Sequence, residues 1–479
     1  MQSPYEIQER WFQKLLKSGE KTVYGKKYGF ESITNFETFK NNVPVVEYHD
    51  VSPYIQRIRN GEKNVLWNTP IRLFSKSSGT TSEQSKFIPV SQESLHSCHF
   101  QAGRDTYALY CNIYSNTKIF QGYALGMGGH LVKDRSTRIY SGDLSALLMN
   151  ELPYFAHRKR KPSLNIALMD EWESKIEKIA ETTIPSNITH ILGVPSWTLL
   201  LLRRILEKTQ QQNLRSVWKN MEVFFHGGVS FEPYHTEYER IISPDMRYFQ
   251  TYNASEGYFA IQDQPDAKDM LLLLNHGIFY EFMPMSEIGK DAPKLLSLDE
   301  IELNTNYGLV ITTNGGLWRY LIGDTIAFTS KTPFRIRVTG RTRYFINAVG
   351  EEVIYENVEK ALQDVLSHYD IAVEEYTGGP VYAKNHHKAR HEWVFEFDQA
   401  PDDIQKFTKL FDLALQKVNS DYAAKRYQNM ILDMPIIHIA PAGTFYEWMR
   451  QRGKLGGQHK VPRLTNDRSH LDTILPLLM

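Results

Sequence analysis

The sequence has few cysteines and no long hydrophobic run. Its 479 residues include only Cys98 and Cys111, too few for a disulfide framework and without the spacing of a metal site, so we expect a reducing compartment. No stretch approaches the roughly 18 consecutive apolar residues of a membrane span. The first residues carry charges where a signal peptide has its apolar segment. We therefore expect a cytoplasmic protein with no membrane partner.

The sequence also lacks an excess of charge of either sign. Lys and Arg total 55, and Asp and Glu also total 55. A protein that mainly grips nucleic acid needs a surface field of one sign, so this balance argues against a nucleic-acid partner. The basic run at residues 157–161 is a local exception, and we interpret it as a solvated loop.

Several catalytic signatures are missing. No Gly-Lys pair is followed by Ser or Thr, which excludes the phosphate loop of P-loop NTPases. There is no G-x-S-x-G elbow of a serine hydrolase. His386, His387 and His391 lie close together but lack the HExxH order, and Pro380 and the flanking charges favour a polar loop over a metal site.

Hydrophobic periodicity predicts an α/β protein with two domains. Ser3-Pro4 has the form of a helix start. The first domain, residues 1–339, alternates helices with strands. Its predicted elements are helices at 171–181 and 196–209 and strands at 222–225, 270–274 and 334–338. The second domain, 340–479, is predicted as a compact α+β module. Its elements are a helix at 356–367, a strand at 371–376, a turn at 378–380, a strand at 392–397, a helix at 403–417 and a strand at 435–439.

The strongest local signal is the run Ser77-Ser78-Gly79-Thr80-Thr81-Ser82, followed by Lys86. Hydroxyls beside a glycine provide donors on a backbone that can bend around phosphate oxygens, and the lysine adds positive charge. Taken alone, the run also fits a solvated Ser/Thr loop.

Later segments add further groups in a defined order. A strand predicted at 224–226 leads into Gly227-Gly228, where the backbone can approach a flat ligand. The segment 251–257 offers an aromatic side chain and a carboxylate. The segment 318–324 is predicted to end a strand at Asp324, whose carboxylate suits a ribose diol, and Gly340-Arg341 marks the domain boundary.

Together these motifs resemble the adenylate-forming superfamily of acyl-CoA synthetases and firefly luciferase. The order is SSGTT, GG, YNASEG, YLIGD and GRTRYFINAVGEEV. YGKKYGF at 24–30, the stretch at 66–91 and GQHKVPRL at 457–464 resemble, more narrowly, the auxin-responsive acyl acid-amido synthetases, also called the Gretchen Hagen family. The resemblance implies a large N-terminal adenylate-forming domain with mixed β-sheets and a β-barrel-like part flanked by helices. It also implies a small, mobile C-terminal α+β domain.

The resemblance also implies a site for ATP and Mg²⁺. The residues implied to hold the departing phosphates are Ser77, Ser78, Gly79, Thr80 and Thr81. Those implied to border the adenine or complete the nucleotide site are Gly227, Gly228, Tyr252, Asn253, Ala254 and Ser255. Glu256 is implied to bind Mg²⁺ and act in catalysis, Asp324 to hold the ribose hydroxyls, and Arg341 to help fix the nucleotide. Lys460 is implied as the catalytic cation at the α-phosphate, with Lys454 as its nearest competitor.

These roles predict a ligase that activates a small carboxylic acid as an acyl-adenylate and transfers the acyl group to an amine, which we expect to be an amino acid. Val194 and Trp197 are candidates for the acid pocket, although Trp197 fits a structural core equally well. A thioester-forming ligase shares the first half-reaction, and a non-catalytic nucleotide-binding protein shares the fold. The sequence leaves open the acid, the acceptor and the oligomeric state, and it is compatible with a monomer.

Overall fold

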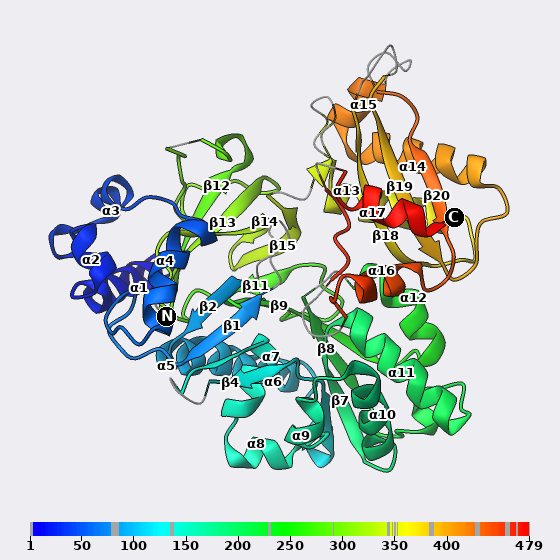
Figure 1. The fold of residues 1–479 in the computed structure, drawn as a ribbon, viewed down its shortest axis with the longest axis horizontal. Helices are drawn as coiled ribbons and strands as arrows, with labels where there is room; N and C mark the ends of the chain where they lie inside the picture. Colours follow the sequence, from blue (N-terminus) through cyan, green and yellow to red (C-terminus); the bar gives the residue numbers. More distant parts are fainter. Residues whose placement is uncertain are drawn as a thin grey trace. The chain divides into compact units, whose positions relative to one another are not determined.

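The computed structural model divides the chain into two compact units (Figure 1). The larger unit comprises Met1–Val229, Glu239–Ile322 and Ile326–Val338, and the smaller comprises Ser230–Tyr238, Gly323–Thr325 and Thr339–Met479. The residues that the structure describes are 3–77, 86–134, 138–228, 231–290, 292–342, 345–346, 348, 351, 353–382, 388–426, 432–455, 460–465 and 468–478. The predicted division into 1–339 and 340–479 stays a prediction; two short segments from its first part cluster here with the smaller unit.

The first helix, α1 (Pro4–Gly19), begins where the sequence predicts. Ser3 is its N-cap: the hydroxyl accepts from the Glu6 N–H at 3.2 Å, and the Glu6 carboxylate accepts from the Ser3 N–H at 3.1 Å. This reciprocal pair satisfies two backbone donors that the helix leaves open. The buried face of α1 carries Trp11, Phe12, Leu15 and Leu16. Three helices follow: α2 (Val23–Lys27), α3 (Phe36–Asn42) and α4 (Tyr48–Arg59).

The larger unit is built on an eleven-stranded sheet with the order β12-β13-β14-β15-β11-β10-β9-β8-β7-β3-β6. Its strands are β3 (Tyr123–Gly126), β6 (Arg160–Lys161), β7 (Ile188–Gly193), β8 (Val223–Gly227), β9 (Arg247–Ala254), β10 (Gly257–Ile261), β11 (Met270–Leu272), β12 (Ile278–Pro284), β13 (Asn306–Thr313), β14 (Tyr320–Lys331) and β15 (Phe334–Arg341). β6, β3, β7, β8 and β9 run parallel, whereas β9, β10, β11 and β15 pair antiparallel. This mixed pattern agrees with the predicted α/β class.

A four-stranded sheet accompanies it, with the order β2-β1-β5-β4. Its strands are β1 (Leu73–Ser77), β2 (Lys86–Val90), β4 (Leu131–Lys133) and β5 (Tyr140–Gly142). The helices of this part of the chain include α5 (Gln92–Ser94), a π-helical turn (Leu95–Phe100), α6 (Gln101–Ile113), α7 (Leu144–Glu151), α8 (Tyr154–Arg158), α9 (Leu164–Ala167), α10 (Trp172–Thr183) and α11 (Pro195–Thr209). They are followed by α12 (Glu232–Ile241), whose residues up to Tyr238 cluster with the smaller unit. Apolar residues of α6 pack against β8, β9 and β10.

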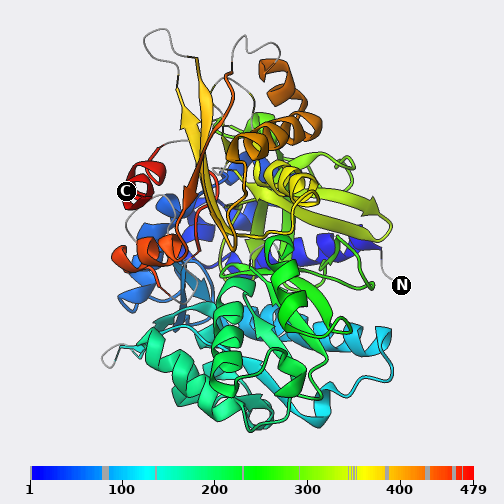
Figure 2. The same cartoon turned by 90° about the vertical axis from the view of Figure 1, so that its right-hand side faces the viewer.

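The smaller unit contains a three-stranded sheet, β18-β19-β20. The strands are β18 (Val373–Val381), β19 (Arg390–Phe397) and β20 (Ile436–Ala440), and the helices are α13 (Tyr355–Leu366), α14 (Ile404–Val418), α15 (Ser420–Arg426), α16 (Thr444–Gln451) and α17 (Leu471–Ile474); a short pair, β16 (Phe345–Ile346) and β17 (Val353–Ile354), precedes them. Trp393 and Phe395 pack with α13 and α14, whereas Val394 packs with α16 and α17. Alternation along β19 therefore places helices on both faces of the sheet (Figures 1 and 2).

The predicted turn at 378–380 is wrong. β18 continues through these residues, and Gly378, Gly379 and Pro380 pair with Trp393, Glu392 and His391 of β19. A Cβ on Gly378 would lie 2.3 Å from the Trp393 ring. The glycine therefore allows a large aromatic ring to cross the strand, which local sequence cannot distinguish from a turn signal.

The prediction that Asp324 ends a strand is also wrong. β14 begins at Tyr320 and continues to Lys331, so Asp324 lies inside it. Gly323 has φ +95°, and this left-handed residue interrupts the regular path of the strand. The expected loop at 157–161 is incorrect as well, because this run ends α8 and forms the edge strand β6, in which Arg160 is buried.

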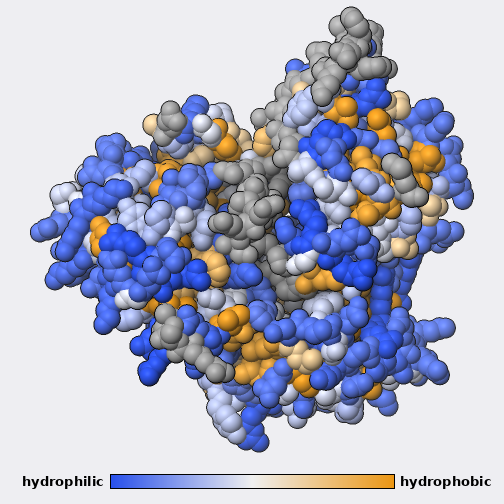
Figure 3. Space-filling view, viewed as in Figure 1, coloured by the Kyte–Doolittle hydropathy of each residue, from blue (hydrophilic) through white to orange (hydrophobic). Residues whose placement is uncertain are grey.

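Among the described residues, no helix is both long and apolar enough to cross a membrane. The face drawn in Figure 3 shows hydrophobic side chains gathered in separate patches among hydrophilic ones. The mixed sheets and the helix-rich C-terminal part agree with the predicted fold class, and the β-barrel-like part stays a prediction.

Candidate active site

The carboxyl ends of the parallel strands bring together several predicted residues of the larger unit. β7 ends at Gly193, β8 at Gly227 and β9 at Ala254, and these strands are consecutive neighbours in the sheet. Ligands of open parallel sheets bind beyond this edge. The predicted acid-pocket, adenine and Mg²⁺ residues of this unit therefore follow neighbouring strands, although they are far apart in sequence (Figure 1).

The turn between β9 and β10 is fixed to the strand that leads into the Ser/Thr run. Ser255 and Glu256 form this turn and are 4% and 9% exposed. The buried Ser75 hydroxyl, on β1, donates to the Ser255 hydroxyl at 2.8 Å. Ser77 is the last residue of β1. The hydrogen bond thus places the start of the predicted phosphate-binding run beside the turn that carries Glu256.

The rest of the predicted phosphate-binding run lies outside the described residues, namely Ser78, Gly79, Thr80 and Thr81. Asn253 and Ala254 are half-buried at the end of β9. Tyr252 is 7% exposed, and its ring centroid lies 4.9 Å from that of Phe259. Its ring is therefore part of the hydrophobic core, and a role beside the adenine stays a prediction.

The double glycine after β8 has a backbone that requires glycine. A Cβ on Gly227 would lie 2.5 Å from the Thr251 carbonyl oxygen, and Gly228 has φ +83°. Side chains are excluded at the first position by space and disfavoured at the second by backbone conformation. The end of β8 therefore presents bare backbone, as the approach of a flat ring demands.

Val194 and Trp197 lie at the start of α11, directly after β7. Val194 is the N-cap residue, and Trp197 is half-buried with its ring 4.8 Å from Trp172 in an edge-to-face arrangement of 71°. Trp197 thus has a packing partner within the larger unit. The predicted role of both residues in an acid pocket stays a prediction.

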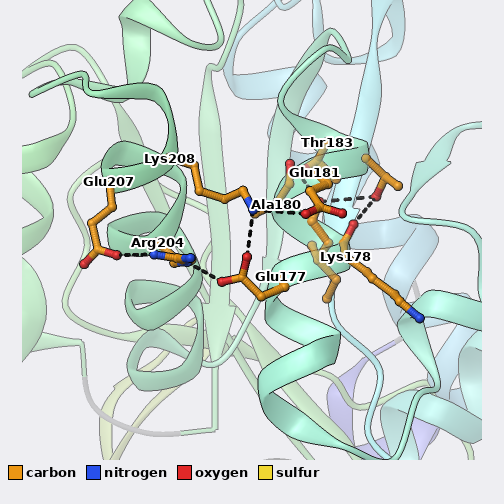
Figure 4. Close-up of polar contacts among 10 residues, drawn as sticks. Glu177, Lys178, Ala180, Glu181, Thr183, Arg204, Glu207 and Lys208 are labelled. Atoms are coloured by element: carbon orange, nitrogen blue, oxygen red, sulfur yellow. Dashed lines mark hydrogen bonds and ion pairs between the residues drawn. The ribbon is translucent and has the colours of Figure 1, made fainter.

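A network of charged side chains joins α11 to α10 (Figure 4). Glu177 accepts from Arg204, and it also accepts from Lys208 at 2.7 Å. Lys208 lies 3.1 Å from Glu181. The hydrogen bond from Arg204, followed by that from Lys208, lowers the pKa of Glu177 to about 2. These partly exposed pairs link α10 to the helix whose first turn carries Trp197.

One residue at this edge was missed by the sequence prediction. Lys175, on α10, is 3% exposed, and its ammonium donates to the carbonyl oxygens of Gly128 at 2.5 Å and Met169 at 3.1 Å. Burial lowers the pKa of Lys175 to about 8, and Asp143 opposes that shift. The lysine holds the segment that follows β3. A glycine-rich run directly after a strand, Gly126-Met127-Gly128-Gly129, is the signal that points to it.

In the smaller unit, Asp324 and Arg341 form an ion pair. The Arg341 Nε donates to Asp324 Oδ1 at 2.9 Å; the aspartate side chain is 11% exposed and that of the arginine 43%. The Thr342 N–H donates to the Gly323 carbonyl at 2.8 Å and holds the bent part of β14 beside this pair. The structure therefore brings together a carboxylate and a cation that were predicted to hold the same nucleotide.

Lys460 lies within electrostatic reach of this pair. Its residue surface is exposed to water, although many protein atoms surround the ammonium. This crowding, followed by repulsion from Arg341, lowers the pKa of Lys460 to about 8, and Asp324 opposes the shift. The pKa of Lys454 is lowered by burial and then by Arg452. Asp324 and Arg341 act on the pKa of Lys460 but not on that of Lys454, and the assignment of Lys460 stays a prediction.

The sequence predicted that His391 lies in a polar loop, and this prediction is wrong. His391 lies in β19, fully buried, with Nε2 2.7 Å from the equally buried Glu351 carboxylate. His386 and His387 lie outside the described residues. Within the described ranges, no cluster of three or more His, Cys, Asp and Glu side chains has the arrangement of a metal site. Mg²⁺ bound with substrate phosphates needs only one or two protein carboxylates, and Glu256 fits that mode.

Family models match most of the chain. Residues 1–246 match the GH3 family N-terminal domain, 271–341 the GH3 family central domain and 355–469 the GH3 family C-terminal domain. A curated relative, indole-3-acetic acid-amido synthetase GH3.3 of Arabidopsis thaliana, is 24% identical over an alignment that covers 95% of this chain and 89% of the relative.

Solved structures share the fold. AtGH3.15 acyl acid amido synthetase in complex with 2,4-DB matches with a TM-score of 0.82 at 16% identity, covering 99% of this chain and 94% of its own. 2-Hydroxyisobutyryl-CoA ligase in the postadenylation state, in complex with R3-HIB-AMP, matches with a TM-score of 0.62 at 13% identity, covering 98% and 91%. These matches confirm the resemblance drawn from the motifs. The chain belongs to the GH3 family.

Proposed function

We propose that this protein is an ATP-dependent ligase that adenylates a small carboxylic acid and transfers the acyl group to an amine, most simply that of an amino acid. One observation carries the proposal: a carboxylate and two cations, Asp324, Arg341 and Lys460, act on one another electrostatically. That set suits the ribose hydroxyls and the phosphate charge of a nucleotide. The names of two relatives, an indole-3-acetic acid-amido synthetase and a jasmonoyl–L-amino acid synthetase, support the acceptor class.

In the first half-reaction, a substrate carboxylate oxygen attacks the α-phosphorus of ATP. A new P–O bond forms, the bond to the β-phosphate oxygen breaks, and pyrophosphate leaves. The protein contributes alignment and charge stabilisation rather than a covalent intermediate. Lys460 neutralises charge on the α-phosphate oxygens, Arg341 helps to fix the nucleotide, and Asp324 accepts hydrogen bonds from the ribose.

Further residues of the chain are proposed for the phosphates, the metal and the base. The run that starts at Ser77 donates hydrogen bonds to the leaving phosphates, and the bare backbone at Gly227-Gly228 borders the adenine. Glu256 would hold Mg²⁺, which would supply positive charge to the phosphates of ATP. The hydrogen bond between Ser75 and Ser255 supports this assignment because it keeps the turn of Glu256 beside β1.

In the second half-reaction, the amine nitrogen attacks the acyl carbonyl carbon. The C–N bond forms, the bond from that carbon to the AMP oxygen breaks, and the amine loses a proton to solvent or base. The products are an amide and AMP. The predicted cytoplasmic location stays a prediction.

The test is pyrophosphate exchange into ATP across a panel of carboxylic acids, followed by AMP release with candidate acceptors. Indole-3-acetic, jasmonic, benzoic and fatty acids form a suitable first panel. Amino acids and coenzyme A are then supplied separately with the active acid. Acceleration by coenzyme A alone would replace the amide proposal with a thioester-forming ligase. Nucleotide binding without any acid-dependent exchange would favour a non-catalytic binding protein.

A further inference from the structure

A buried polar cluster in the smaller unit surrounds Arg463. Its side chain is 9% exposed. One Arg463 Nη donates to the Tyr234 hydroxyl at 2.9 Å and lies 3.3 Å from a Glu375 carboxylate oxygen. The Tyr234 hydroxyl donates to the other oxygen of Glu375 at 2.7 Å. The arginine, the tyrosine and the carboxylate are therefore joined pairwise by polar contacts in a closed ring.

A second carboxylate and two aromatic rings complete the cluster. The other Arg463 Nη lies 3.4 Å from Glu359. The guanidinium lies 4.7 Å from the Tyr376 ring centroid and 5.6 Å from that of Tyr234. Arg463 thus has a carboxylate on each of two sides and aromatic faces beside it. A planar guanidinium is held more rigidly in this arrangement than an ammonium.

The charge states of Tyr234 and Arg463 do not change near neutral pH. Burial, followed by the Glu375 carboxylate, raises the pKa of Tyr234 well above its ordinary value. Burial lowers the pKa of Arg463, but Glu375 and the tyrosines reverse this and leave it raised. Tyr234 therefore stays a neutral donor and Arg463 a cation near neutral pH.

The segment that carries Lys460 is attached to the sheet beside this cluster. The Thr377 hydroxyl donates to the Pro462 carbonyl at 2.7 Å, the Gly378 N–H to the Arg463 carbonyl at 2.9 Å, and the Thr465 N–H to the Gly378 carbonyl at 3.0 Å. These bonds fix the backbone after residue 461, and the Arg463 side chain fixes its orientation. Lys460 precedes the first of them by two residues.

We infer that Tyr234 and Arg463 are positioning residues that hold Lys460 for the adenylation step. The inference rests on the proposed function. Tyr234 belongs to α12, whose start follows the Gly227-Gly228 turn by a few residues. The chain segment after the proposed adenine turn therefore contributes the hydroxyl that clamps the segment of the proposed α-phosphate lysine. Both segments belong to the smaller unit.

The experiment is a double-mutant cycle measured by acid-dependent pyrophosphate exchange. Tyr234→Phe removes the hydroxyl and keeps the aromatic ring. Arg463→Lys keeps the positive charge and removes the planar guanidinium with its paired N–H donors. Each change is expected to lower kcat about 10-fold to 100-fold, with a smaller effect on the KM for ATP, because a misplaced group acts on the transition state. Combined with Lys460→Ala, either change is expected to cause no further loss, since the group it positions is gone.

The matched control is a second tyrosine–carboxylate–arginine group in the same unit. The Tyr422 hydroxyl donates to Asp412 at 2.7 Å, and Arg426 donates to both oxygens of that carboxylate at 2.6 and 2.7 Å. Tyr422→Phe removes an equivalent buried hydroxyl. It is expected to lower thermal stability about as much as Tyr234→Phe and to leave the exchange rate within about twofold of the wild type.

Additive losses in the Lys460→Ala background would overturn the inference, as would equal losses of activity in Tyr422→Phe. If Lys460→Ala leaves no measurable exchange, the labelling of Lys460 by an amine reagent is titrated against pH with mass-spectrometric readout. Tyr234→Phe must then raise the pKa of Lys460 toward its ordinary value, and an unchanged pKa refutes the inference. A wild-type protein without exchange would instead refute the proposed function, so the two failures are distinguishable.

Discussion

The charge of Lys460 gives the sharpest pH prediction. Crowding and Arg341 lower its pKa to about 8, and only the protonated amine stabilises the α-phosphate. The acid-dependent kcat/KM for ATP, which reports the free enzyme, should therefore be constant below about pH 7 and fall above pH 8. At pH 9 the protonated fraction is about one tenth, so a tenfold loss is expected there and about 100-fold at pH 10.

The assay is pyrophosphate exchange between pH 6.5 and 10 at subsaturating ATP. Lys460→Arg supplies a cation that stays charged throughout this range. We expect this variant to be slower at neutral pH, because its guanidinium does not fit the geometry of an ammonium, but to show no fall above pH 8. Lys454→Met serves as the matched control. It removes the competing lysine and should keep both the rate at neutral pH and the break, that is, the fall in kcat/KM above pH 8.

Three results would refute this reasoning. If Lys460→Arg kept the same break, the titrating group would be elsewhere. If Lys454→Met removed the break and Lys460→Arg did not, Lys454 would be the catalytic cation. A wild-type profile that is flat to pH 10 would show that exposure to water keeps Lys460 at its ordinary pKa.

Three further predictions concern packing and charge. Glu281→Gln should destabilise the larger unit by about 3–5 kcal/mol in urea unfolding, because it leaves Arg319 as an uncompensated buried charge. The Arg319 side chain is 4% exposed and lies 2.8 Å from the Glu281 carboxylate. A loss below about 1 kcal/mol would show that the pair is dispensable. Ser75→Ala should cost about 1–3 kcal/mol, since Ser255 loses its donor, and it should slow exchange; an unchanged rate would separate this bond from the site. The pKa of Glu177 is depressed to about 2, so its pairs stabilise the fold above the ordinary carboxylate pKa and lose that effect as pH falls toward 2. In thermal scans, Glu177→Gln should therefore lose less stability than the wild type between pH 5 and 2. A profile parallel to the wild type would contradict this.

Local patterns predicted the elements whose signals are local. The Ser3 cap and the apolar face of α1 lie within one stretch of sequence, and so do the periodic helices α11 and α14. The error at Gly378 arose because its glycine accommodates Trp393, a residue of the neighbouring strand. Glycine and proline composition is the same for a turn and for a strand crossed by a large ring.

The site was predictable by motif order but not by contact. The sequence places Ser75 and Ser255 far apart, and only the folded sheet reveals their hydrogen bond. The sequence around Lys175 is that of an amphipathic helix with a surface lysine. The burial of Lys175 depends on the segment after β3. The clamp of Tyr234 on Arg463 likewise joins distant segments. Long-range pairs of this kind leave no trace in periodicity or spacing.

The most direct test of the proposed activity is acid-dependent pyrophosphate exchange followed by product analysis with amino acids. The proposal predicts that at least one carboxylic acid promotes exchange in the presence of Mg²⁺, and that an amino acid then releases AMP with one amide formed per AMP. Substitution of Lys460 by alanine should reduce that exchange by about 10² to 10³. Exchange independent of any carboxylic acid, or AMP release with coenzyme A and no amide from any amino acid, would contradict it.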